Sequence, residues 1–109
     1  MKIYFANHKY ISVDFVNEEY RRGYRYLNFG ITNFNISFDS LFNFLSNKEN
    51  LIKITVVDND NNVLADFNNI YHSVSTLNRN IGADGTIFFN VQLSSTEDGI
   101  ENIDEKNIH

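Results

Sequence analysis

Apolar and polar residues alternate through most of this sequence, and that pattern is typical of strands with one buried face. Clear runs cover residues 11–15, 27–31, 52–57 and 87–93, and shorter runs cover 3–5, 63–67 and 70–75. Within 11–15, the apolar residues Ile11, Val13 and Phe15 are expected on one face. The pattern predicts about six or seven strands and rules against a helical bundle.

One segment breaks the period of two. Its apolar residues follow the i, i+3, i+4, i+7 spacing of a helix face: Phe38, Leu41, Phe42 and Leu45. Ser37 stands where a helix N-cap is favoured. We therefore expect a short amphipathic helix over residues 38–47, packed on the sheet. Phe44 falls off the apolar stripe, so it is expected to be exposed and counts as a candidate partner contact.

Two segments carry the residues of tight turns. Residues 58–62 read Asp-Asn-Asp-Asn-Asn between two strand runs, and Asp84-Gly85 precedes the last run. Asn, Asp and Gly tolerate left-handed backbone angles, so both segments favour hairpins between antiparallel strands. The sequence thus predicts an α+β fold, a mostly antiparallel sheet with one short helix packed on it.

The charge is unevenly distributed along the 109 residues. Residues 1–94 hold nine carboxylates against eight Lys and Arg, whereas residues 95–109 hold five against one. We expect one β-rich domain over 1–94 and an acidic C-terminal tail over 95–109. The tail's acidic residues are candidate partner contacts: Glu97, Asp98, Glu101, Asp104 and Glu105. A near-neutral domain does not favour generic nucleic-acid binding, which needs clustered cations.

No cysteine occurs in the chain, which excludes disulfides and zinc–thiolate sites. The first residues have no long apolar run after a basic start, so neither a signal peptide nor a membrane span is predicted. The expected location is the cytoplasm.

The turn at residues 58–62 also matches the first half of a calcium-binding loop. Four oxygen-bearing residues are weak metal-ligand candidates: Asp58, Asp60, Asn62 and Asp66. Val63 stands where such a loop has its glycine, and Asn69 where it has its bidentate Glu. A plain β-turn is therefore the favoured interpretation, and we expect no metal and no cofactor.

Catalytic motifs are missing from the sequence. It contains no GxSxG, no HExxH and no glycine-rich phosphate loop, and its three histidines are far apart. The pair Asp58 and Asp60 lies in a predicted turn, where burial would not tune a pKa for acid–base work. We expect a protein without enzymatic activity and without a small-molecule substrate.

One basic and aromatic cluster stands out, and its six members are candidate partner contacts: Tyr20, Arg21, Arg22, Tyr24, Arg25 and Tyr26. Interleaved Arg and aromatic residues are typical of protein interface anchors, and they also occur in sites for single-stranded nucleic acid. Glu18 and Glu19 stand beside the arginines and partly cancel their charge. The cluster is thus a plain surface, a protein-binding patch or, least favoured, a nucleic-acid contact.

Residues 36–51, followed by 54–60 and 63–65, carry a resemblance to a group of proteins. They resemble small uncharacterised proteins of phages and prophages in low-GC Gram-positive bacteria, which have a short helix, a strand, an Asp/Asn/Gly turn and a second strand. The likeness extends loosely to Tyr71, Val74 and Ser75. Ser40 stands where a capping Glu is expected, and the turn lacks Gly. The resemblance implies a mobile-element origin in a bacterial host and transfers no functional residue.

These observations predict a protein that acts by binding another protein. With the phage resemblance, the concrete expectation is an inhibitor of a host defence system, of the anti-CRISPR type. The alternative is a virion or assembly subunit that acts by forming homo-oligomers.

Overall fold

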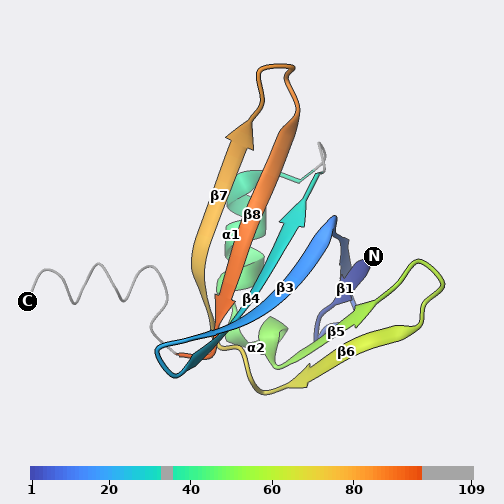
Figure 1. The fold of residues 1–109 in the computed structure, drawn as a ribbon, viewed down its shortest axis with the longest axis vertical. Coiled ribbons are helices and arrows are strands. Elements are labelled where there is room, and N and C mark those ends of the chain that lie inside the picture. The colour runs from blue at the N-terminus through green and yellow to red at the C-terminus, as the bar shows by residue number, and fades with distance from the viewer. Residues whose placement is uncertain (33–35, 97–109) are drawn as a thin grey trace, which may run out of the picture.

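The computed structural model describes residues 1–32 and 36–96, and within them the predicted α+β fold is confirmed. Eight strands form two four-stranded antiparallel sheets in this part of the chain (Figure 1). Sheet A has the order β2-β1-β5-β6, with β1 (Lys2–Tyr4), β2 (Tyr10–Ser12), β5 (Lys53–Val57) and β6 (Val63–Asn68). Sheet B has the order β3-β4-β8-β7, with β3 (Phe15–Arg21), β4 (Tyr24–Ile31), β7 (Ser73–Ile81) and β8 (Ile87–Ser94).

The predicted helix is present as α1 (Phe38–Ser46). The Ser37 hydroxyl oxygen accepts a hydrogen bond from the Ser40 backbone N–H at 3.1 Å, which caps its first turn. Leu41 and Leu45 are buried, and Figure 1 shows α1 behind β7 and β8, so the helix covers one face of sheet B. The opposite, outer face of sheet B is not covered by any described element (Figure 1).

A second, four-residue helix, α2 (Lys48–Leu51), follows α1 where the sequence predicts only an exit from the helix. The Asn47 side chain caps it by accepting from the Glu49 backbone N–H at 3.1 Å. This turn carries Leu51 into the core, where it is 1 % exposed.

The core is one cluster that both sheets and α1 share. Alternate residues of the two central strands of sheet B are buried: Leu27, Phe29, Ile31, Phe89, Val91 and Leu93. Sheet A contributes Ile3 and Ile54, which are fully buried. Because one period-two set faces this cluster, the remaining side chains of β4 and β8 point to the outer face.

The structure corrects the prediction at residues 11–15. The chain leaves sheet A after Ser12 and enters sheet B at Phe15. The Asp14 backbone N–H donates to the Gly30 carbonyl oxygen at 2.8 Å, which anchors the start of the new strand. Val13 is buried but Phe15 is 46 % exposed, so the two do not share a face as predicted.

Both predicted hairpin turns are present. The Asp58 backbone N–H donates to the Asn62 carbonyl oxygen at 3.0 Å, and Asn61 has a φ of 65°. In the other turn the Asp84 carboxylate accepts from the Thr86 backbone N–H at 3.0 Å. Strand β7 runs to Ile81, beyond the predicted run of 70–75. Its polar second half, residues 78–80, continues to pair with β8 although it lacks the alternating pattern.

Within residues 1–32 and 36–96, neither helix has the length and hydrophobicity needed to cross a lipid bilayer.

Candidate functional site

The basic and aromatic cluster of residues 20–26 forms the end of the β3–β4 hairpin. Arg21 pairs with Tyr24, and Arg22 and Gly23 between them have φ angles of 55° and 84°. Two positive φ angles in a two-residue loop are those of a type I′ turn, which joins twisted antiparallel strands well. Because neighbouring strand residues point to opposite faces, the hairpin splits the cluster instead of gathering it into one patch.

On the inner side, Arg25 binds the rest of the protein. Its guanidinium carbon lies 5.6 Å from the ring centroid of Tyr20, 5.8 Å from that of Phe67 and 6.0 Å from that of Tyr71. Its Nη2 atom lies 3.6 Å from a carboxylate oxygen of Glu18. Cation–π contacts with several rings hold a guanidinium in place, so Arg25 ties the hairpin to the β6–β7 connection.

Tyr71 at this junction is 1 % exposed, and its ring meets Phe67 edge to face at 5.3 Å. The phenolic oxygen has no hydrogen-bond partner among the described residues. Burial raises the pKa of the phenol above its usual value, and the charge of nearby Arg25 partly opposes this. The guanidinium of Arg25 thus lowers the pKa of the phenol chiefly through its charge, with a smaller effect from its proximity to the phenolic oxygen, although the two groups do not meet the geometry of a hydrogen bond.

On the outer side, Arg21 is held by three neighbours. Its guanidinium carbon lies 4.4 Å from the Tyr26 ring centroid, and Nη1 lies 3.9 Å from a Glu19 carboxylate oxygen. Its Nη2 donates to the Gln92 side-chain oxygen at 3.4 Å. Arg21 and Arg25 therefore each face a carboxylate, which leaves little net positive charge for a phosphate backbone.

Three members of the cluster remain available at the end of the hairpin. Tyr20 is 73 % exposed and Tyr24 is 48 % exposed. Arg22 is exposed and forms no hydrogen bond or ion pair with any other described residue. The turn projects past the end of β8 at the lower left of Figure 1. We call Tyr20, Arg22 and Tyr24 the tip surface.

The prediction that Phe44 is exposed is wrong. Its ring meets the buried ring of Phe5 edge to face, with 5.0 Å between centroids, and it packs against the core. The apolar face of the helix predicts that Phe44 is exposed, because that pattern accounts only for packing against one sheet. In the structure α1 has a second neighbour, the segment that links β1 to β2, and Phe44 fills that contact.

The oxygen atoms of Asp58 serve the turn. Asp58 Oδ1 accepts from the backbone N–H groups of Asp60 and Asn62 at 2.8 and 2.9 Å, and Oδ2 accepts from the Asn62 side chain at 3.2 Å. These bonds, the Asn62 backbone N–H first among them, lower the pKa of Asp58. Asp66 lies on β6 and accepts from the Thr55 hydroxyl at 2.8 Å. The structure therefore uses the two candidates Asp58 and Asp66 for local hydrogen bonds.

No group of three His, Asp or Glu side chains that could hold a metal ion occurs within residues 1–32 and 36–96. The acidic tail candidates Glu97, Asp98, Glu101, Asp104 and Glu105 lie outside the described residues. The chain up to that point stays attached to sheet B, because the Ser95 backbone N–H donates to the Arg25 carbonyl oxygen at 3.0 Å.

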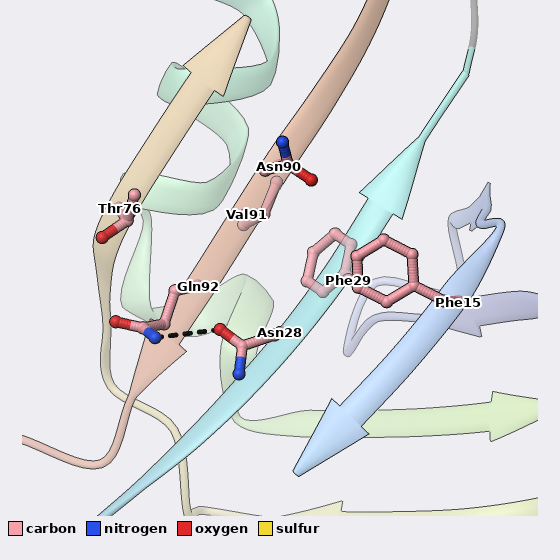
Figure 2. A pocket seen from close by; sticks show the side chains of 7 residues that line it. All are labelled: Phe15, Asn28, Phe29, Thr76, Asn90, Val91 and Gln92. Atoms are coloured by element: carbon pink, nitrogen blue, oxygen red, sulfur yellow. Dashed lines mark hydrogen bonds between the residues drawn. The ribbon is translucent and has the colours of Figure 1, made fainter. Parts of the chain in front are cut away.

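The outer face of sheet B carries a second feature, a hollow of about 230 Å³. Figure 2 shows its lining, which comes from all four strands of the sheet: Phe15, Asn28, Phe29, Thr76, Asn90, Val91 and Gln92. We call this hollow the amide groove. Phe29 and Val91 belong to the core and form only its floor.

The amides beside the groove form a fixed network. Gln92 Nε2 donates to Asn28 Oδ1 at 2.9 Å (Figure 2) and to a Glu19 carboxylate oxygen at 3.2 Å. Asn28 Nδ2 donates to the same Glu19 oxygen at 3.0 Å. The Ser75 hydroxyl donates to Gln92 Oε1 at 2.8 Å. With their amides paired to one another, Asn28 and Gln92 have defined orientations.

The sequence reasoning missed the amide groove. Asn28, Asn90 and Gln92 do fall at the polar positions of alternating runs, which is the available signal. That signal predicts only that they point away from the core. Their meeting depends on the β4–β8 register, which pairs Asn28 with Gln92 and Gly30 with Asn90.

Comparison with known proteins adds no relative. No family model matches the sequence, and searches of the curated proteins and of the solved structures find no significant match.

Proposed function

We propose that this protein is a non-enzymatic binding domain that recognises a protein partner through its tip surface. The observation that carries the proposal is the exposure of two tyrosines, 73 % for Tyr20 and 48 % for Tyr24, on either side of unpaired Arg22. Tyr and Arg are the residues most enriched among those that dominate interface energetics. A projecting hairpin can insert them into a pocket of the partner.

The base of the hairpin favours this use. Arg25 on the inner side and Arg21 on the outer side hold the strands through aromatic and carboxylate contacts. Strands that are already ordered lose less conformational entropy on binding, so more of the contact energy appears as affinity. The same carboxylate contacts neutralise the charges of Arg21 and Arg25, which would otherwise attract nucleic acid.

One further observation supports binding without catalysis. Hydrogen bonds within turns lower the pKa of Asp58 and of Asp84, and burial in the core raises the pKa of Tyr71. None of these groups lies on the tip surface or in the amide groove. In a site that performs acid–base chemistry, the groups with shifted pKa values usually lie inside the binding cavity.

The phage resemblance gives the proposal its concrete form. The partner is then a host defence protein that this domain occludes in the bacterial cytoplasm, as anti-CRISPR proteins do. Binding by one projecting hairpin suits occlusion, since a small chain blocks a site by filling it.

Affinity capture from a lysate of a low-GC Gram-positive host tests the proposal. The tagged full chain should retain one stoichiometric partner, and a Tyr20→Ala, Tyr24→Ala double variant should lose at least tenfold in affinity. Tyr10→Ala is the matched control, because Tyr10 is 52 % exposed on sheet A, away from the hairpin. A variant that ends at residue 96 measures how much the acidic tail residues contribute to the affinity for the partner. Equal capture by the double variant and the wild type would overturn the proposal.

One observation favours homo-oligomerisation as the second candidate, in line with a virion or assembly subunit. Strand β6 is an edge strand of sheet A, and Val63 and Leu64 on it are 63 % and 58 % exposed. An apolar, unpaired edge is a template for pairing with another chain. Light scattering across a concentration series tests this. A Leu64→Lys variant should lower the oligomer mass, and a constant monomer mass for the wild type would exclude this function.

A further inference from the structure

The amide groove contains a flat aromatic surface. The Phe15 side chain extends from β3 toward β4 (Figure 2). Its ring lies over Gly30 of β4. A Cβ atom at position 30 would stand only 2.3 Å from the ring's Cε1 atom, so the ring rests directly on the backbone. Phe15 is nevertheless 46 % exposed, which leaves the other side of the ring facing solvent.

Polar groups without partners stand opposite this ring. The Asn90 amide and the Thr76 hydroxyl are half-buried, and neither forms a hydrogen bond with any other described residue. Neither group is a fully buried unpaired atom, so water solvates both, and a ligand that displaces this water has to replace its hydrogen bonds. Asn28 and Gln92 beside them are held by their mutual hydrogen bond. The groove thus offers amide donors and acceptors in defined positions, together with a free hydroxyl.

The lining also restricts the charge of the occupant. The side chains that line the groove are all uncharged. The two charges beside the lining already face each other: Arg21 donates to Gln92 and lies 3.9 Å from a Glu19 carboxylate oxygen, and Glu19 accepts hydrogen bonds from Asn28 and Gln92. A charged ligand would lose hydration without gaining an opposite charge, so a neutral ligand rich in hydroxyl groups fits best.

We propose that the amide groove binds one hexopyranose ring of a neutral glycan. The C–H groups on one face of the sugar stack on the Phe15 ring, whose face carries partial negative charge. The sugar's hydroxyl groups, each a donor and an acceptor, pair with the Asn90 amide, because Asn90 lies opposite Gly30 in the β4–β8 register. The Thr76 hydroxyl pairs with Gln92 in register, farther along the groove, where it can bond a neighbouring ring of the glycan. The volume of about 230 Å³ lies below the ~300–1,000 Å³ typical of pockets for drug-sized ligands, which suits a single ring.

This inference goes beyond the proposed function, because the groove and the tip surface share no residue. A shallow site for one sugar ring is expected to be weak, with a Kd of about 1 mM for a single ring. An oligosaccharide that places neighbouring rings along β4 and β8 should bind more tightly than the corresponding methyl glycoside.

Backbone amide NMR of the full chain tests the inference. The probes are methyl glucoside, methyl galactoside and methyl mannoside, followed by cello-, malto- and laminari-oligosaccharides. We expect saturable shifts at the backbone amides around Asn28, Thr76 and Asn90 with at least one oligosaccharide. No saturable shift with any probe, or shifts confined to other strands, would overturn the inference.

Matched variants make the test specific. Phe15→Ala and Asn90→Ala should each weaken binding at least tenfold, whereas Phe88→Ala and Asn17→Ala should change it less than twofold. Phe88 and Asn17 belong to the outer positions of β8 and β3 but do not line the groove. Unchanged binding by Phe15→Ala would overturn the stacking role. The Tyr20→Ala, Tyr24→Ala variant should bind sugar normally, which separates failure here from failure of the proposed function.

Discussion

The ring of Phe15 rests on the α-carbon of Gly30, on the strand that pairs with its own. The register places the two residues directly opposite each other, and the lack of a Cβ atom at Gly30 makes room for the ring. This contact explains a glycine in the middle of a buried strand, where its backbone freedom is unfavourable. Gly in a strand interior costs roughly 0.5–1 kcal/mol relative to Ala.

A double-mutant cycle on Phe15 and Gly30 should therefore show a change of sign. In the wild type, Gly30→Ala pushes the ring away, and the lost contact outweighs the gain in backbone stability, so the change destabilises the protein. In the Phe15→Ala background the same change should stabilise the protein by about 0.5–1 kcal/mol. Urea unfolding of the four proteins measures the cycle. The same effect of Gly30→Ala in both backgrounds would contradict the contact.

Removing the Tyr71 hydroxyl should stabilise the protein. The phenolic oxygen is buried without a hydrogen-bond partner among the described residues, and an unsatisfied buried polar group costs about 1–3 kcal/mol. Tyr71→Phe keeps the ring contact with Phe67 and should raise the free energy of unfolding by about 1 kcal/mol. Tyr10→Phe is the control, because its exposed hydroxyl is solvated in both states.

The same residue predicts a difference at alkaline pH. Burial raises the folded-state pKa of Tyr71, so its contribution to stability is complete below the unfolded value of about 10 and is lost as the pH rises through the folded value. The advantage of Tyr71→Phe over the wild type should therefore widen above pH ~10. Unfolding curves at increasing pH measure it, and a constant difference would show that the phenol titrates as it does in the unfolded chain.

Phe44 should contribute to stability as a core residue. Its edge-to-face contact with Phe5 joins α1 to the segment that links β1 to β2, and Phe44→Ala removes that contact and leaves a gap. We expect a loss of about 2–3 kcal/mol in the free energy of unfolding. Asn43→Ala, at the neighbouring exposed position, should change it by less than about 0.5 kcal/mol. Similar small losses of stability for Phe44→Ala and Asn43→Ala would contradict the packing role of Phe44.

The alternation of residues identified the interior strands because each has one face on the core. It failed at β3, an edge strand whose polar residues Glu18 and Glu19 point to opposite sides. Neither face of such a strand is fully buried, so its sequence has no clean period. The remaining sequence signal for this strand was Gly23, a residue that favours a tight turn. In the structure it lies in the two-residue turn between the paired strands β3 and β4.

The sequence predicted the two candidate sites to different degrees, because one consists of neighbouring residues and the other of residues far apart in the chain. The tip surface consists of residues close in sequence, so the cluster was visible, although not its division between two faces. The amide groove joins Phe15, Asn28, Thr76 and Asn90, which are separated by 13 to 48 residues in consecutive steps. Strand order and register bring them together, and these depend on long-range pairing that local patterns do not encode.

The turn at Asp58 predicts a loss of stability in acid. Its carboxylate accepts hydrogen bonds from Asp60 and Asn62, and these lower its folded-state pKa. A lowered pKa stabilises the fold above the unfolded value of about 3.9 and ceases to do so as the pH falls through the folded value. Asp58→Asn should lower the urea midpoint at neutral pH, and the difference from the wild type should shrink as the pH falls through the lowered folded-state pKa of Asp58. Asp60→Asn removes the same charge from a side chain without such bonds, so its effect should be smaller at every pH. Equal effects of the two variants would mean that net charge, and not the turn's hydrogen bonds, sets the acid sensitivity.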